Sequence, residues 1–176
     1  MKSQSETAGR LTRNSSQPQN GTVLRDVQLL LADGTHALLS AVRGRSYLVM
    51  IFTAGFAPST LLRELDARSA ELLEQNARVL VITMIQSNLT PSDAAPPPDL
   101  VVPARDFSGE VHRLLGATDS ADKPVPAIYI TDRFSEVFAV FRQVDQQCPP
   151  QPDEIIRWLE FINYQCEECG PPEWPE

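Results

Sequence analysis

The chain has 176 residues, enough for one compact domain with tails, and a domain of that size buries its core without needing disulfides or a metal. Its formal net charge of −8 at pH 7 argues against nucleic acid and anionic membrane surfaces as partners. No apolar run of about 18 residues is present, so no membrane-spanning helix is expected. Residues 1–21 are rich in Ser, Gln and Asn, and we expect them to form a disordered tail.

The first half of the chain predicts a parallel strand–helix–strand unit behind a hairpin. Residues 23–39 alternate in hydrophobicity around the tight-turn pair Asp33-Gly34, which is typical of a β-hairpin. Residues 47–52 and 78–83 are continuous apolar runs of strand length, as in strands covered on both faces. Between them, a turn of small residues at 53–60 opens a helical pattern with leucines on one side. This order implies a parallel pair joined by a right-handed crossover.

The second half predicts more alternation of strands and helices. A Pro-rich loop occupies residues 89–98. Asp153 is expected to cap the final helix, whose apolar residues share one face. The other predicted elements are a strand at 100–102, a short helix before Gly116, and strands at 127–131 and 137–141 that form an antiparallel hairpin.

Three segments resemble the thioredoxin-like redoxins. The strand Leu48–Phe56 followed by Ala57-Pro58-Ser59-Thr60 resembles the strand and turn that carry the Cys-x-x-Cys of thioredoxins. Val125-Pro126-Ala127 resembles the segment with the family's cis-proline, and residues 106–116 are similar to the alkyl hydroperoxide reductase and thiol-specific antioxidant group of peroxiredoxins. The resemblance covers residues 22–164, which we expect to be a single domain. It implies an α/β thioredoxin-like fold, with a central mixed sheet flanked by helices, and an antioxidant thiol oxidoreductase activity.

The chain departs from this family at the active-site turn. Ala57 stands at the position of the first cysteine and Thr60 at that of the second. A thiol peroxidase needs a thiolate at this helix start, where the helix dipole lowers the thiol pKa. Ser59 and Thr60 offer hydroxyls, whose expected role is helix capping, and nothing in the sequence places His36 or His112 nearby as a base. We therefore expect a non-catalytic module that binds a protein or peptide.

In such a module, Pro126 could have either of two roles. A cis proline before an edge strand would leave the neighbouring backbone free to pair with an extended peptide. The alternative is a turn that determines the fold and binds nothing.

A second cysteine pair, Cys166 and Cys169, lies in the C-terminal tail at residues 165–176. Three interpretations stay open: a thiol–disulfide oxidoreductase site, half of a zinc site, and an inert reduced tail. Zinc would gain further ligands from Cys148 or from a second copy in a homodimer. The flanking glutamates raise the thiol pKa and so disfavour thiol exchange. Because no secretory signal is visible, we expect a reducing cytoplasmic location, and we expect no cofactor. Trp174 lies in the Pro-rich tail, where we expect its large apolar ring to pack against another surface.

Overall fold

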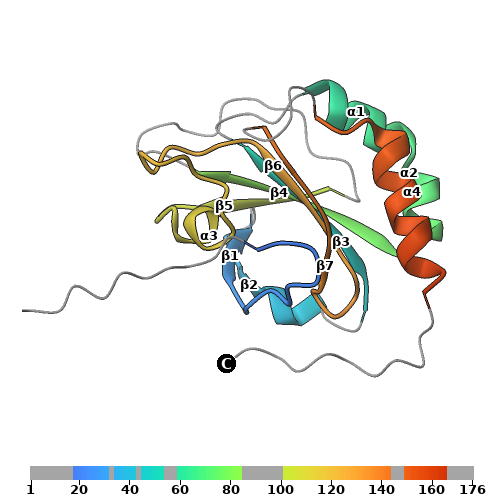
Figure 1. Cartoon of the computed structure of the whole chain (residues 1–176), viewed down its shortest axis with the longest axis horizontal. Coiled ribbons are helices and arrows are strands. Elements are labelled where there is room, and N and C mark those ends of the chain that lie inside the picture. The colour runs from blue at the N-terminus through green and yellow to red at the C-terminus, as the bar shows by residue number, and fades with distance from the viewer. Residues whose placement is uncertain are drawn as a thin grey trace, which may run out of the picture.

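The computed structural model describes residues 18–31, 34–42, 45–53, 59–84, 101–143 and 149–165. Within these stretches seven strands form one sheet in the order β2-β1-β5-β4-β3-β6-β7. Figure 1 shows α1, α2 and α4 on one side of the sheet and α3 on the other. The expected α/β class, with a mixed sheet flanked by helices, is therefore confirmed. No helix in the described stretches is long and apolar enough to cross a bilayer.

The centre of the sheet consists of the two apolar runs that the sequence predicts as strands. β3 (Tyr47–Thr53) is buried along its whole length and pairs in parallel with β4 (Ala77–Met84). Such strands are continuously apolar because neither face meets water. The crossover between them is formed by α1 (Ser59–Ala67) and α2 (Ser69–Glu74). Because β3 and β4 run in the same direction, their C-terminal ends lie side by side. We call this end of the sheet, which is distinct from its outermost strands, the carboxyl edge, and α1 starts there.

The crossover contains two helices where the sequence pattern predicts one. Arg68 separates them with φ −106° and ψ 23°, outside helical geometry. At this break the Arg68 guanidinium donates hydrogen bonds to Glu71 and to the distant Asp153. Leu72 faces the core, whereas Leu73, which the pattern places on the same side, is exposed. Neither Gly nor Pro marks the break, so the pattern locates the helical segment but not its interruption.

The predicted N-terminal hairpin is confirmed, with β1 (Gln28–Leu31) antiparallel to β2 (His36–Leu38). β1 also pairs antiparallel with β5 (Val101–Asp106), which runs parallel to β4. β5 is longer than the strand predicted at residues 100–102, because its polar end pairs with β4 although it has no apolar pattern.

β6 (Ala127–Thr131) and β7 (Val137–Arg142) form the second predicted hairpin. β6 pairs antiparallel with β3, and β7 is the last strand of the sheet on that side. A β-bulge interrupts their register between Ile130 and Thr131. The hairpin therefore completes the sheet next to its most buried strand.

Three helical segments lie outside the crossover. They are the 3-10 helix η1 (Leu39–Val42), α3 (Glu110–Leu114) and α4 (Pro152–Asn163). The prediction that Asp153 caps the last helix is wrong. Gln151 is the N-cap residue and Asp153 lies inside the first turn, because a proline fits the first helical position, where no hydrogen-bonded N–H is needed.

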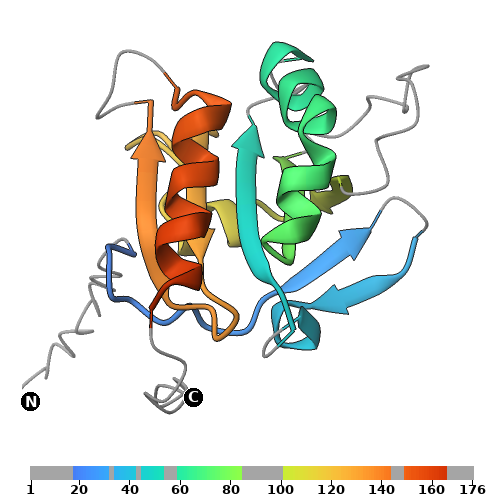
Figure 2. The ribbon, with the colours of Figure 1, turned by 90° about the vertical axis from the view of Figure 1, so that its right-hand side faces the viewer.

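Each face of the sheet has its own hydrophobic core, since successive side chains of a strand point to opposite faces. Val49 and Ile51 pack with the layer formed by α1, α2 and α4, which lies in front of the sheet in Figure 2. Met50 and Phe52 pack on the opposite face with residues of α3. The two cores hold the carboxyl edge of β3 from both sides.

Candidate functional site

The turn that resembles a thioredoxin active site lies between the end of β3 and the start of α1. Ala57 and Pro58 fall in residues 54–58, outside the described residues. α1 begins at Ser59, and Thr60 is exposed in its first turn. A helix start presents unpaired backbone N–H groups and partial positive charge, which stabilise an anion such as a thiolate. The sequence places no cysteine here, so this helix start offers hydroxyl groups instead.

Two threonine hydroxyls meet where β3 and β4 end. Thr53 lies opposite Thr83 in the parallel register, and their Oγ1 atoms are 3.2 Å apart. Thr53 is buried and Thr83 half-buried. An aliphatic hydroxyl stays protonated at neutral pH unless a base removes its proton. The hydrogen bond therefore joins two strand ends and supplies no anionic nucleophile.

A buried Asp–His pair lies at the same edge, at the end of β5. Asp106 Oδ2 accepts hydrogen bonds from the backbone N and from Nδ1 of His112, both at 2.9 Å, and Oδ1 accepts one from Ser108 Oγ at 3.3 Å. Burial by itself raises the pKa of Asp106, but the hydrogen bonds from His112 and Ser108 outweigh burial and hold that pKa below its ordinary value. Asp106 is therefore a carboxylate at neutral pH.

His112 is completely enclosed by the core on the α3 side. Its ring stands edge-on to Phe52, with the ring centroids 5.0 Å apart. Because a carboxylate only accepts hydrogen bonds, Nδ1 carries the proton of the bond to Asp106. Nε2 lies buried in the core, with no hydrogen-bond partner among the described residues. A base so enclosed cannot reach a hydroxyl at the exposed start of α1, so the pair fastens α3 to β5.

No pattern in the sequence predicts this pair. Asp106 and His112 are six residues apart, and the chain between them turns at Gly109, which has a φ of 67°. The only signal in the sequence is a polar Asp that ends a strand shortly before a glycine turn and a histidine. That combination is common on exposed loops, so it does not by itself predict burial.

Pro126 precedes β6 at the carboxyl edge. The described residues contain no cis peptide bond, so Pro126, the candidate for the family's cis-proline, follows a trans bond. β6 is also not an edge strand, since it lies between β3 and β7. Val125 N donates to Ala117 O, and Gln143 N donates to Pro126 O, so the trans path is held by hydrogen bonds within the domain. The free backbone expected near Pro126 is absent there, and the sheet edge belongs to β7.

The three cysteines, Cys148, Cys166 and Cys169, lie outside the described residues. Their described neighbours are Pro149, which precedes α4, and Gln165, which follows it. α4 has 12 residues, about 18 Å along its axis at a rise of 1.5 Å per residue. The chain therefore enters α4 from Cys148 and leaves toward Cys166 at the opposite end, as the ends of α4 in Figure 2 show.

The end of α4 that leads to Cys166 is far from the start of α1. Tyr47, the first residue of β3, donates a hydrogen bond from its hydroxyl to Asn163 Oδ1 at 3.3 Å in the last turn of α4. α1 follows the other end of β3, and a seven-residue strand spans about 23 Å. The segment that carries Cys166 and Cys169 thus starts at the opposite end of β3 from the thioredoxin-like turn.

No metal centre is found in the part of the chain that the structure describes, where no group of three or more His, Cys, Asp or Glu side chains is placed to hold an ion. The zinc interpretation depends on Cys166 and Cys169, which lie beyond this part. It stays a prediction.

No protein-family model matches the sequence, and no curated protein matches it. Solved structures do match. Mycobacterium bovis AhpC aligns with a TM-score of 0.68 at 16% identity, covering 88% of this chain and 98% of that one. Enterococcus faecalis AhpC aligns at 0.69 and 19% identity, over 86% and 96% of the two chains. The peroxidoxin BcpB from Mycobacterium tuberculosis aligns at 0.66 and 18% identity, over 82% and 98%.

Such low identities establish the fold and leave the chemistry to the residues of the site. The alignments cover nearly the full length of the matched structures, so the likeness extends over the whole of those folds. The chain therefore has the peroxiredoxin-like thioredoxin fold.

Proposed function

We propose that this redoxin-like protein performs no thiol chemistry at the usual site of its fold and instead binds a protein or peptide partner. The observation that carries the proposal is the residue content of the site. In the resemblance to the redoxins, Ala57 and Thr60 take the positions of the family's two cysteines, and residues 53–60 contain no cysteine. The described edge adds the Thr53 hydroxyl and the Asp106–His112 pair, and neither supplies a thiolate or an accessible base.

The edge strand β7 is the binding surface that the sheet favours. Gln143 N donates to Pro126 O, so the peptide groups of Gln143 and of alternate residues before it face β6. The peptide group of Val140 consequently faces outward. A sheet edge of this kind can accept an extended segment as an added strand, with backbone hydrogen bonds supplying the affinity.

The N-terminal segment makes backbone hydrogen bonds with the beginning of β7, and Pro18 O accepts a hydrogen bond from the Arg142 side chain at the end of β7. Gly21 N donates to Val137 O, and Val137 N donates to Thr22 O. Among the described residues, no segment pairs with the outer edge of β7 after Val137. The proposed occupant is an extended partner segment, and a second copy of this chain that pairs β7 with β7 would form the homodimer the sequence suggested.

Peptides selected from a displayed random library against the immobilised protein test this surface. We expect bound peptides to slow hydrogen exchange at the Val140 amide. Val140→Pro should abolish their binding, because it removes an outward N–H and leaves the bonds to β6 intact. Val140→Thr keeps the N–H and the β-branched shape and should bind like the parent. Peptides that bind Val140→Pro as tightly as the parent would contradict the proposal.

The second candidate function rests on the Cys166–Cys169 pair. It is thiol–disulfide exchange in a reducing cytoplasm, and its non-catalytic counterpart is a zinc ion shared by the pair or by two copies. Thiol titration and zinc analysis of protein purified without chelator separate the two. Stoichiometric zinc with masked thiols favours the metal, whereas metal-free protein whose disulfide forms reversibly and is lost in Cys166→Ser favours exchange.

A further inference from the structure

Exposed apolar side chains occur at the ends of two helices, α2 and α4. Among the described residues the exposed large apolar side chains are Leu38, Leu73, Phe107, Phe161 and Tyr164. Three of these lie at the ends of α2 and α4: Leu73 is 62% exposed, Phe161 52% and Tyr164 90%. We call these three residues the helix-end patch.

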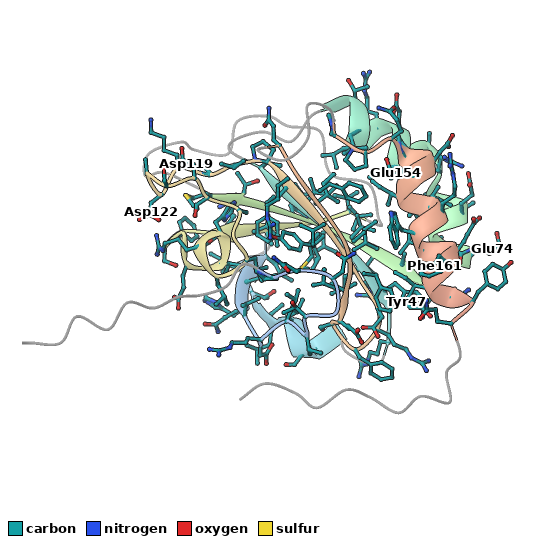
Figure 3. The ribbon with its side chains drawn as sticks, viewed as in Figure 1. Tyr47, Glu74, Asp119, Asp122, Glu154 and Phe161 are labelled. Carbon is teal, nitrogen blue, oxygen red and sulfur yellow. The ribbon has the colours of Figure 1, made fainter. Side chains whose placement is uncertain are left out.

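The framework of the helix-end patch is fixed by polar and aromatic contacts. Asn163 Nδ2 donates to Gln75 Oε1 at 3.2 Å and thereby joins the ends of α4 and α2. Half-buried Trp158 stands edge-on to Phe161, with the ring centroids 5.7 Å apart. Figure 3 shows Phe161 and Glu74 at the same end of the molecule. The patch therefore presents aromatic rings on a rigid support.

The chain leaves α4 directly at the patch. Residues 166–176 follow Gln165 and contain Pro171-Pro172-Glu173-Trp174-Pro175. In an extended polyproline conformation such an eleven-residue segment reaches about 34 Å at 3.1 Å per residue. That reach is enough for residues 171–175 to turn back over the end of α4.

The chemistry of the segment suits the patch. Proline-rich segments bind surfaces lined by aromatic rings, because the extended conformation is already formed and little entropy is lost on binding. Trp174 adds a large apolar ring that is stabilised by leaving water. We propose that residues 171–175 dock on the helix-end patch of their own chain, with Trp174 against Phe161 and Tyr164.

The size of the patch favours this occupant over a second copy. Its three partly exposed side chains present on the order of 400 Å², given that an aromatic side chain carries about 150–250 Å². Each partner of a standard stable interface buries roughly 800 Å². One short segment therefore matches the area, and its docking holds Cys166 and Cys169 at the end of the molecule away from Ala57.

The fluorescence of Trp174 tests the docking directly. The chain has 2 tryptophans, so Trp158→Phe keeps an aromatic ring beside Phe161 and leaves Trp174 as the sole reporter. In this background we expect blue-shifted emission and weak quenching by acrylamide. The double change Phe161→Ser and Tyr164→Ser should shift the emission to that of a solvated tryptophan and raise quenching several-fold. Leu38→Ser and Phe107→Ser, which change exposed apolar side chains elsewhere, should change neither the emission nor the quenching.

Three results would overturn this proposal. One is solvated emission of Trp174 in the Trp158→Phe protein itself. Another is unchanged emission after the patch substitutions in a protein whose far-ultraviolet dichroism and melting remain those of the parent. A third is a blue shift that grows with protein concentration, which would place the segment on a second copy. Val140→Pro should leave the emission unchanged, which separates this docking from binding at β7.

Discussion

At the scale of single residues, the protonation of Asp106 determines how acid changes the stability of the contact between β5 and α3. Its carboxylate accepts hydrogen bonds from His112 and Ser108, which hold its pKa below the ordinary value of 3.8. A pKa lowered by folding means that folding favours the charged form. The resulting stability is fully present above the unfolded pKa and is lost as pH falls through the folded pKa.

Asp106→Asn should therefore lower the free energy of unfolding by about 1.5–3 kcal/mol at pH 7, the typical contribution of a hydrogen bond to a charged group. The difference from the parent should shrink below pH 3.8, where the parent loses its own contribution. Urea denaturation at pH 7 and at a pH below 3.8 measures the loss of stability and its decrease in acid. Glu110→Gln, an exposed change at the start of α3, serves as the control. An equal loss for Asp106→Asn at both pH values would contradict the assignment.

The sequence predicts which segments end at the carboxyl edge, but it does not predict which side chains contact each other there. Thr60 lies in the first turn of α1, as the long apolar strand and the turn of small residues before it predict, whereas Ala57 lies outside the described residues. The Asp106–His112 pair is not found, because burial of a charged side chain depends on what α3 covers. Pro126 is correctly placed before a strand, but the strands that flank it depend on the strand order of the whole sheet.

At the scale of elements, the entry into α3 depends on a glycine in a crowded place. Gly109 has a φ of 67°, and a Cβ there would lie 3.0 Å from Met84 Cε and 3.2 Å from a guanidinium nitrogen of Arg113. Gly34, in the β1–β2 turn, has a φ of 84° and nothing within 4 Å of such a Cβ. The two glycines share the left-handed backbone but differ in crowding.

Gly34→Ala should destabilise the protein by about 1–2 kcal/mol, the left-handed strain of a residue with a Cβ. Gly109→Ala should cost more than that, because Met84 and Arg113 must also move. Paired urea denaturation curves measure the difference between the two variants. Equal losses would show that the flexible end of Met84 moves aside without cost, contrary to the expected tight contact between α3 and β4.

The sequence predicts elements well where an apolar pattern repeats, and poorly where a polar contact sets the boundary. β3, β4 and both hairpins are found from runs and turns of the expected kind. The break at Arg68 and the polar end of β5 are missed, because a guanidinium contact and a neighbouring strand determine them. The N-cap of α4 is misplaced for a related reason, since Pro152 takes the first helical position.

At the scale of the whole molecule, one sheet separates two cores. Leu159 of α4 is completely buried in the core shared with α1 and α2, and Leu115 is buried in the core on the α3 side. Because β3 and its neighbours contribute side chains to both cores, the two should melt together as one domain.

Leu159→Ala and Leu115→Ala should each lower the free energy of unfolding by about 2–5 kcal/mol, the usual cost of a cavity in a packed core. The double variant should show the sum of the two losses, because the sites lie on opposite faces of the sheet and share no contact. Circular dichroism and fluorescence should report the same transition in each variant. Transitions that separate between the two probes would show that the two layers unfold independently.

The fold alone would suggest a thiol oxidoreductase, whereas the residues at positions 57–60 include no cysteine. The central claim is that the protein has no thiol chemistry at this site. The most direct measurement is the turnover of hydrogen peroxide and of a protein disulfide by the purified chain with a thiol reductant. We predict no turnover above the reductant alone, and none in Cys166→Ser or Cys169→Ser. Turnover by the parent chain that either cysteine substitution abolishes would contradict this account and make the protein a thiol oxidoreductase that works through its C-terminal pair.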